Sequence, residues 1–142
     1  MEGVYTINKC NKDQIKTIVD GINGYNLSKI PALADTWTAL EFAATNSDDH
    51  TIAGILGGVG CWSALEIKVL WVSEQHRNSG MGSALLSDME TVAREKGAVV
   101  SILNTFDFQS PVFYFSNGYL LIGQISDFPL DISRMYFSKK LI

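Results

Sequence analysis

Hydrophobic positions follow two different periods along this chain, and the change between them predicts a mixed α+β protein. Three apolar stretches, at 37–45, 51–60 and 64–73, are separated by polar turn residues and are typical of β-strands. From Met81 to about Lys96 the apolar residues recur every three or four positions, which predicts an amphipathic helix. Strands therefore lead into a helix in the middle of the chain.

The N-terminal part is predicted to form one strand and one helix before an irregular segment. Val4 to Asn8 alternates between polar and apolar positions, which predicts a short first strand. Asn11 is placed to cap a helix from Lys12 to Ile22, which Gly21 and Gly24 are expected to end. Gly24 to Asp35 has turn chemistry and is expected to be irregular.

The last third predicts a strand, a short helix and a closing pair of strands. These elements are expected at Ala98–Asn104, Pro111–Asn117, Tyr119–Ile125 and Ile132–Ser138, with a loop at 127–129. The sequence contains no linker and no internal repeat. We therefore expect one domain over residues 1–142, an α+β sheet flanked by helices.

The strand-to-helix turn from Leu70 to Leu86 has the chemistry of an anion site. The first turn of a helix has backbone N–H groups without an internal acceptor, and the helix dipole is positive there. Gly80 and Gly82 allow close approach of a phosphate, and Arg77 adds a full charge. A P-loop is excluded because no Lys follows the turn, and a dinucleotide fingerprint because Leu85 is bulky.

Two motifs in this region resemble those of a known family. The run Arg77-x-x-Gly80-x-Gly82 after a Leu-x-Val strand resembles motif A of the GNAT superfamily of N-acetyltransferases. Thr105 to Tyr114, followed by Gly118-Tyr119, is similar to the motif B segment of small bacterial members. The resemblance covers Thr38 to Leu141.

The resemblance implies a mixed, mostly antiparallel sheet whose fourth and fifth strands splay apart. It also implies acetyl-CoA as co-substrate, with its pantetheine in the gap and its pyrophosphate at the helix N-terminus. The residues that it assigns to this co-substrate are Leu70, Trp71, Val72, Arg77, Asn78, Ser79, Gly80, Met81, Gly82 and Ser83, with polar contacts from Asn104 and Gln109. The resemblance also implies that the segment at 24–35 helps to form the acceptor pocket; the alternative is a merely structural connection that contains a short helix.

Acetyl transfer to an amine needs a base for the amine and a proton for the departing thiolate. Glu66 stands 14 residues before Gly80, the spacing of the catalytic glutamate in histone-acetylating members, so the resemblance makes it the candidate base. The alternatives for Glu66 are an ion pair with Lys68, which is expected on the same strand face, or simple surface exposure, with an ordered water as the base.

Tyr114 stands four residues before Gly118, as in the family's YxxxG[FY] signature, and is the candidate acid. The alternative for this residue is ordinary aromatic packing. One departure concerns Asp107, where many family members have Asn. A carboxylate cannot donate the amide hydrogen bond, so Asp107 is expected to cap the short helix or to face a cationic acceptor.

Composition and net charge indicate which classes of partner and which cellular compartment to expect for this protein. A net charge of −4 with 11 scattered Lys and Arg argues against nucleic-acid binding and favours a cationic acceptor. Cys10 and Cys61 have no metal-type spacing and are expected to be free thiols. With no signal segment and no apolar run long enough to span a membrane, the sequence predicts a cytoplasmic protein.

The sequence thus predicts an acetyl-CoA-dependent N-acetyltransferase that acts directly, in a ternary complex, on a primary amine of a small molecule or peptide. A non-catalytic acyl-CoA-binding protein on the same fold is the alternative. The sequence does not decide the identity of the acceptor, or whether the protein is a homodimer.

Overall fold

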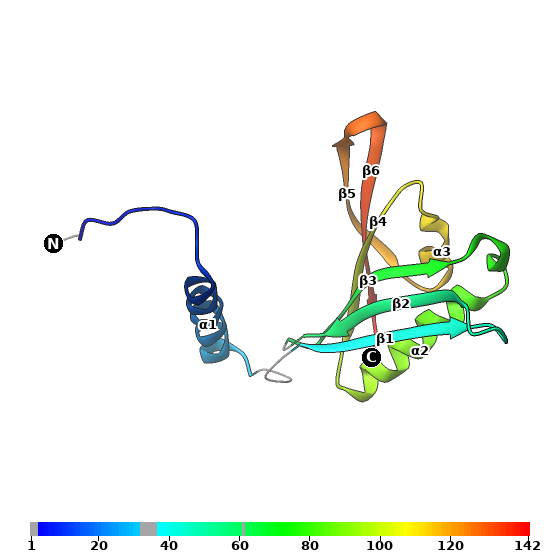
Figure 1. Cartoon of the computed structure of the whole chain (residues 1–142), viewed down its shortest axis with the longest axis horizontal. Coiled ribbons are helices and arrows are strands. Elements are labelled where there is room, and N and C mark those ends of the chain that lie inside the picture. Colours follow the sequence, from blue (N-terminus) through cyan, green and yellow to red (C-terminus); the bar gives the residue numbers. More distant parts are fainter. Residues whose placement is uncertain (1–2, 32–36, 61) are drawn as a thin grey trace. The chain divides into compact units, whose positions relative to one another are not determined.

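The computed structural model describes residues 3–31, 37–60 and 62–142, apart from the side chains at 127 and 128. They belong to two compact units that divide between Ala32 and Leu33 (Figure 1). The first unit contains the helix α1 (Lys12–Lys29). The second contains the strands β1 (Thr38–Thr45), β2 (Thr51–Val59), β3 (Ala64–Val72), β4 (Val100–Phe106), β5 (Leu120–Phe128) and β6 (Ile132–Lys140), the helices α2 (Met81–Glu95) and α3 (Pro111–Ser116), and the short 3₁₀ turns η1 (Glu74–His76) and η2 (Pro129–Asp131).

In the N-terminal unit, α1 begins at the predicted residue and ends later than predicted. Asn11 and Gln14 form a capping box, in which Asn11 Oδ1 accepts from Gln14 N at 2.8 Å and Gln14 Oε1 accepts from Asn11 N at 2.9 Å. The predicted end at Ile22 is wrong because α1 continues to Lys29. An interior glycine costs only about 1 kcal/mol, so Gly21 and Gly24 weaken the helix without ending it.

Two other predictions for this unit are corrected or lie outside the described residues. Residues 4–8 form no regular secondary structure, so the predicted first strand is wrong. Alternation is only a local preference, and a strand exists only where a partner strand satisfies its backbone. The predicted irregular segment is partly helix up to Lys29, and its residues 32–36 lie outside the described part, as does Cys61.

The second unit is built on one six-stranded sheet in the order β1-β2-β3-β4-β6-β5. Every neighbouring pair is antiparallel except β3 and β4, which confirms the predicted mixed, mostly antiparallel sheet. Helix α2 contacts β1, β2 and β3 and covers that end of the sheet (Figure 1). Strand β5 reaches Phe128, three residues beyond its predicted end.

Strands β3 and β4, which were expected as the fourth and fifth, separate soon after they begin. Their parallel pairing covers only Ala64–Val100, Leu65–Ser101 and Glu66–Ile102. The prediction that these two strands splay is confirmed, and they are the third and fourth because the expected first strand does not form.

A β-bulge in β3 lies where the two strands part. Leu56 pairs with Val69 and Gly57 with Ile67, so Lys68 is an extra residue. A Cβ on Gly57 would lie 2.3 Å from the Glu66 carbonyl oxygen, so only glycine permits this close approach. The bulge reverses the side-chain alternation beyond Lys68, so Leu70 packs on the core although simple alternation would place it on the face of Glu66 and Lys68, both of which are exposed.

A buried charged residue of α2 forms hydrogen bonds that link this helix to β4, β6 and the C-terminal end of α3. Glu90 is 4% exposed, and its carboxylate accepts from Lys139 Nζ at 2.8 Å and from the Tyr119 hydroxyl at 2.8 Å. The Tyr119 hydroxyl also lies 2.8 Å from Ser101 Oγ, and Lys139 donates to the Asn117 carbonyl at 3.0 Å. These contacts join α2, β4, β6 and the C-terminal end of α3.

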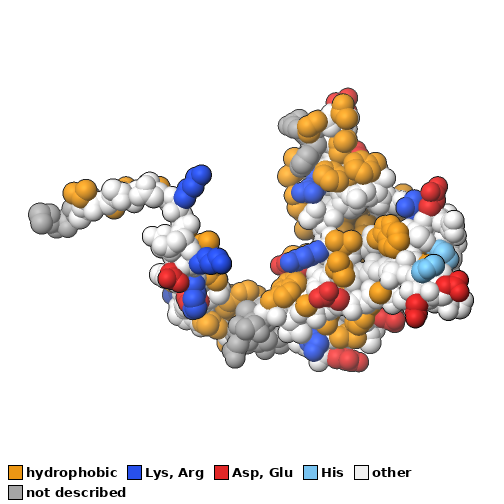
Figure 2. Space-filling view, viewed as in Figure 1, with side chains coloured by type: hydrophobic (Ala, Val, Ile, Leu, Met, Phe, Trp, Pro, Cys, Tyr) orange, Lys and Arg blue, Asp and Glu red, His pale blue; other side chains and the backbone are white. Residues whose placement is uncertain are grey.

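The surface of this unit is mixed in charge. On the face seen in Figure 2, its Lys and Arg side chains lie apart from one another among acidic and hydrophobic ones. Such a face does not supply the continuous positive charge that binds nucleic-acid phosphates. Among the described residues, no helix has the length and apolar character needed to cross a membrane.

Replacing Lys139 by Met should destabilise the protein by about 3 kcal/mol, because Glu90 would keep its buried charge without its cationic partner. Lys140→Met is the matched control, since Lys140 is exposed. Urea unfolding of both variants measures the difference. Equal stability of the two variants would contradict a structural role for the Glu90–Lys139 pair.

Candidate functional site

Two cavities adjoin at the gap between β3 and β4, and three residues line both of them: Leu70, Gln109 and Tyr114. The smaller cavity, about 190 Å³, lies between the splayed strands and is also lined by Ile67, Lys68, Val69, Leu103, Asn104 and Thr105. The larger, about 740 Å³, extends to the N-terminus of α2 and is also lined by Trp71, Val72, His76, Arg77, Asn78, Gly80, Met81, Gly82, Ser83, Phe108, Ser110 and Phe113.

The N-terminus of α2 opens into the larger cavity. Gly80 adopts the left-handed conformation, with φ 84°, and its carbonyl accepts the first hydrogen bond of the helix from Ala84 N at 3.0 Å. The N–H groups of Met81, Gly82 and Ser83 precede that bond and therefore have no acceptor within the helix. Three backbone donors and the positive end of the helix dipole face the cavity together.

Close packing holds this helix start against β3 and α3. A Cβ on Gly82 would lie 3.3 Å from the Phe113 ring and 3.7 Å from Val72 Cγ2. A side chain at position 82 would therefore require the Phe113 ring to shift by a few tenths of an ångström. The predicted close approach of a phosphate at Gly82 stays a prediction.

Arg77 places a positive charge at the end of β3. Its Nε donates to the Val72 carbonyl at 3.1 Å, which directs the guanidinium along the larger cavity. The turn beside it is fixed by a 2.6 Å hydrogen bond between Ser73 Oγ and His76 Nδ1 and by a hydrogen bond from Ser79 Oγ to the His76 carbonyl. Among the described residues that line this cavity none is Asp or Glu, so the cavity suits an anion.

The open edge of β3 offers further backbone groups. Ser73 N donates to the Ile52 carbonyl at 2.8 Å, so Ser73 faces β2. Because successive residues of a strand direct their backbone groups to opposite edges, Val72 and Leu70 direct theirs toward the gap. Arg77 occupies the Val72 carbonyl, while the N–H groups of Leu70 and Val72 face the ligand space.

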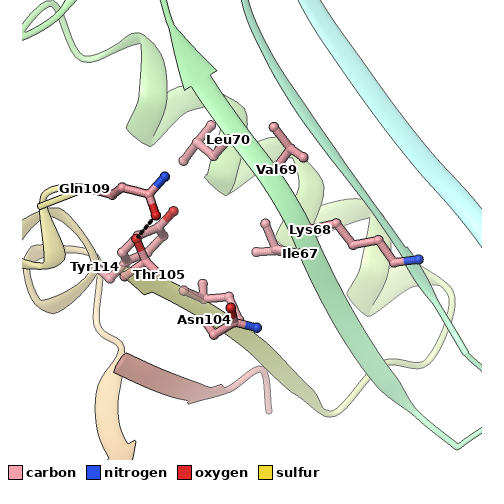
Figure 3. A pocket seen from close by; sticks show the side chains of 9 residues that line it. Ile67, Lys68, Val69, Leu70, Asn104, Thr105, Gln109 and Tyr114 are labelled. Atoms are coloured by element: carbon pink, nitrogen blue, oxygen red, sulfur yellow. Dashed lines mark hydrogen bonds between the residues drawn. The ribbon is translucent and has the colours of Figure 1, made fainter. Parts of the chain in front are cut away.

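Tyr114 stands at the junction of the two cavities. Figure 3 shows its side chain beside Thr105 and Gln109, with Ile67 and Leu70 pointing toward it from β3 and Lys68 extending away. The ring packs edge-on against Phe113, with the centroids 5.1 Å apart. Burial raises the pKa of the Tyr114 phenol above its ordinary value, so the hydroxyl keeps its proton at neutral pH.

Hydrogen bonds of Asp107 and of Gln109 fix the loop between β4 and α3. Asp107 Oδ2 accepts from Ser133 N at 3.1 Å, and Asp107 N donates to the Ser133 carbonyl at 2.9 Å. The expectation that Asp107 caps the short helix is therefore wrong, since its carboxylate binds β6. Gln109 Oε1 accepts from Phe106 N at 2.9 Å and from Thr105 Oγ1 at 3.3 Å, which leaves the Gln109 amide nitrogen as a donor for the cavities.

Most residues predicted to bind the co-substrate line the larger cavity. Asn104 lines the smaller one, and Ser79 lines neither, because it supports the turn. Glu66 also lines neither and is exposed on β3 where that strand is still paired with β4. Its role as base stays a prediction.

Sequence reasoning missed Phe108 and Phe113, which line the larger cavity. Both lie within the segment from Thr105 to Tyr114 that resembles motif B, and neither is assigned a role by that resemblance. An aromatic residue between Asp107 and Gln109 in a polar loop was the available signal for Phe108. The contact of Phe113 with α2 leaves no trace in the sequence.

Comparison with known proteins gives concordant matches. The family model of the acetyltransferase (GNAT) domain matches residues 40–120. Blasticidin-S acetyltransferase from Streptomyces morookaense is 40% identical over 91 residues, which span 63% of this chain and 67% of that protein.

Solved structures of acetyltransferases have the same fold. A crystal structure of an acetyltransferase from Bacillus cereus ATCC 14579 superposes with a TM-score of 0.83 at 29% identity, covering 96% of this chain and 97% of that one. Aminoglycoside 6'-N-acetyltransferase, solved with coenzyme A, superposes with a TM-score of 0.61 at 15% identity, covering 84% and 78%.

Replacing Arg77 by Ala should weaken acetyl-CoA binding about tenfold, because a charged contact to phosphate and the hydrogen bond to the Val72 carbonyl are both lost. Lys96→Ala removes the same charge at the opposite end of α2 and is the control. Isothermal titration at low and high salt measures the dissociation constants. If Arg77→Ala and Lys96→Ala bind alike, the anion is not held at this turn.

Proposed function

The chain belongs to the GNAT family of acetyltransferases and is an acetyl-CoA-dependent enzyme, and from this premise we propose that it acetylates a primary amine of a small antibiotic-like molecule. The observation that carries the proposal is the position of Tyr114, which lines both the large anion-binding cavity and the small cavity beside it. One cavity takes the acetyl donor and the other the acceptor amine.

The donor fits the residues of the larger cavity. Arg77 and the N–H groups of Met81, Gly82 and Ser83 would hold its pyrophosphate, and the N–H groups of Leu70 and Val72 would bind its pantetheine and the thioester oxygen. The thioester supplies an activated acetyl group. Because the described lining of both cavities contains no cysteine, we expect direct transfer to the amine rather than an acetyl-enzyme.

Tyr114 serves as the general acid. As the amine nitrogen forms its bond to the acetyl carbon and the carbon–sulfur bond breaks, the phenol donates its proton to the departing sulfur and later regains one from solvent. Burial keeps the phenol protonated until that moment. A hydrogen bond from the Gln109 amide would orient polar atoms of either substrate next to it.

Deprotonation of the amine is assigned to water. Among the described residues that line the two cavities none is a carboxylate, and Glu66 lies on the paired part of β3. An amine with an ordinary pKa of about 10.4 must lose a proton before it attacks. A water molecule that enters the smaller cavity would reach such an amine, whereas Glu66, which is outside the lining, would need the acceptor to extend beyond that cavity.

The acceptor class rests on the similarity to blasticidin-S acetyltransferase, at 40% identity over 91 residues. The net charge of −4 agrees with a cationic acceptor. Blasticidin S is therefore the first acceptor to test, with spermidine, an aminoglycoside and a peptide with a free N-terminus for comparison. Release of coenzyme A thiol and the mass of the product measure transfer.

We expect blasticidin S to gain one acetyl group while coenzyme A thiol is released from acetyl-CoA. The substitution Tyr114→Phe should lower kcat by at least about 100-fold, while the KM values change little. In the wild type, kcat should not fall at alkaline pH until above about 10, because the raised pKa keeps Tyr114 protonated.

Tyr136→Phe, on β6 and outside the lining of both cavities, controls for the loss of a phenol. An unchanged kcat in Tyr114→Phe would overturn the acid assignment. If acetyl-CoA binds but none of these four amines is acetylated, the proposed class of acceptor is overturned.

A further inference from the structure

Three planar side chains are stacked at the edge of the larger cavity. The Arg134 guanidinium on β6 lies over the Phe106 ring, with Cζ 4.5 Å from the centroid. The rings of Phe106 and Phe108 are 5.4 Å apart and almost parallel, at 9°. Phe106 thus contacts both Arg134 and Phe108, and of these three side chains Phe108 is the one that lines the larger cavity.

The Phe108 ring is exposed and lines the larger cavity. Phe108 is 65% exposed, and it lines the larger cavity together with Gln109 and Ser110. Exposing a phenyl ring to water is unfavourable, and single exposed apolar residues are common on proteins. Here, however, the ring continues an ordered stack and lines a cavity of about 740 Å³.

The backbone on both sides of Phe108 is fixed. Asp107 exchanges two hydrogen bonds with Ser133 on β6, at 2.9 and 3.1 Å. Gln109 N donates to the Phe106 carbonyl at 2.9 Å, and Gln109 Oε1 accepts from Phe106 N at 2.9 Å. The ring is thus presented by a short, doubly anchored turn, so little conformational entropy would be lost when a ligand covers it.

We propose that Phe108 is a stacking platform for a planar nitrogen heteroaromatic ring, and that the Arg134–Phe106–Phe108 stack forms a specificity subsite of the enzyme. Heteroaromatic bases stack favourably on aromatic side chains because every base has a π face, and the contact of the Arg134 guanidinium with the Phe106 ring supports the ring against which Phe108 lies. The proposal rests on the function proposed above, because the ring must belong to one of its two substrates.

Two substrates could supply such a ring. The adenine of acetyl-CoA is one, since the larger cavity is assigned to the donor. A nucleobase-like ring of the acceptor is the other. The chemistry of stacking is the same, and donors and acceptors that lack the ring distinguish the two sources.

The test compares Phe108→Ala, Phe108→Leu and Phe108→Trp with the wild type. Leu restores bulk without a π face, and Trp restores the π face. Val112→Ala is the matched control, because Val112 is 70% exposed on α3 and lines neither cavity. Each variant is assayed with acetyl-CoA and with S-acetylpantetheine as donors, and with blasticidin S and spermidine as acceptors.

Loss of one stacked ring should raise the KM or Kd of the substrate that carries it about 5- to 100-fold in Phe108→Ala and Phe108→Leu, and Phe108→Trp should restore it. If the Phe108 substitutions raise the constant for acetyl-CoA but not the constant for S-acetylpantetheine, the subsite binds adenine. If the substitutions raise the constant for blasticidin S but not the constant for spermidine, the subsite binds a ring of the acceptor.

Equal constants for Phe108→Ala and Val112→Ala with every substrate would overturn the stacking platform. So would full rescue by Leu, which would indicate apolar packing alone. Both results leave acetyl transfer by the wild type untouched, so they are distinguishable from a failure of the proposed function, in which the wild type itself acetylates no amine.

Discussion

The early separation of β3 from β4 is the constraint on which the site depends. Only three residue pairs join the strands before the bulge at Lys68 bends β3 away. Beyond that point, the N–H groups of Leu70 and Val72 have no neighbouring strand, and an unpaired backbone in a protein interior is costly unless a ligand or water satisfies it. Groups beside the gap bond to β6 and not to β3: the Asp107 carboxylate accepts from Ser133 N, and the Tyr114 ring packs against Phe137, with the centroids 5.7 Å apart.

The parts of the site that could be predicted from the sequence are those formed by residues close together in the chain. Arg77, Gly80 and Gly82 lie at the N-terminus of α2 as predicted, because a strand, a turn and a helix in succession determine that geometry locally. The family resemblance gave Tyr114 as the candidate acid, which stays a prediction, and the structure places this residue in the lining of both cavities. The sheet composition, the splayed strands and membership of the GNAT family are confirmed.

The parts that could not be predicted depend on partners far away in sequence. The bulge at Lys68 requires the close approach of Gly57 on β2, and it reverses the faces assigned to β3. Asp107 finds its partner Ser133 26 residues later, which no local pattern indicates. The strand predicted at 4–8 is wrong for the same reason: alternation indicates only a local preference, and these residues have no partner strand in the described structure.

Amide hydrogen exchange with and without acetyl-CoA tests the central claim most directly, namely that backbone donors of a parted strand and a helix N-terminus hold the acetyl donor. Protection should increase at the amides of Leu70, Val72 and residues 81–83, with little change at the sheet edge formed by β5. S-acetylpantetheine should protect the strand amides and leave the helix amides unchanged. Saturating acetyl-CoA that leaves exchange at both groups of amides unaltered would contradict the account.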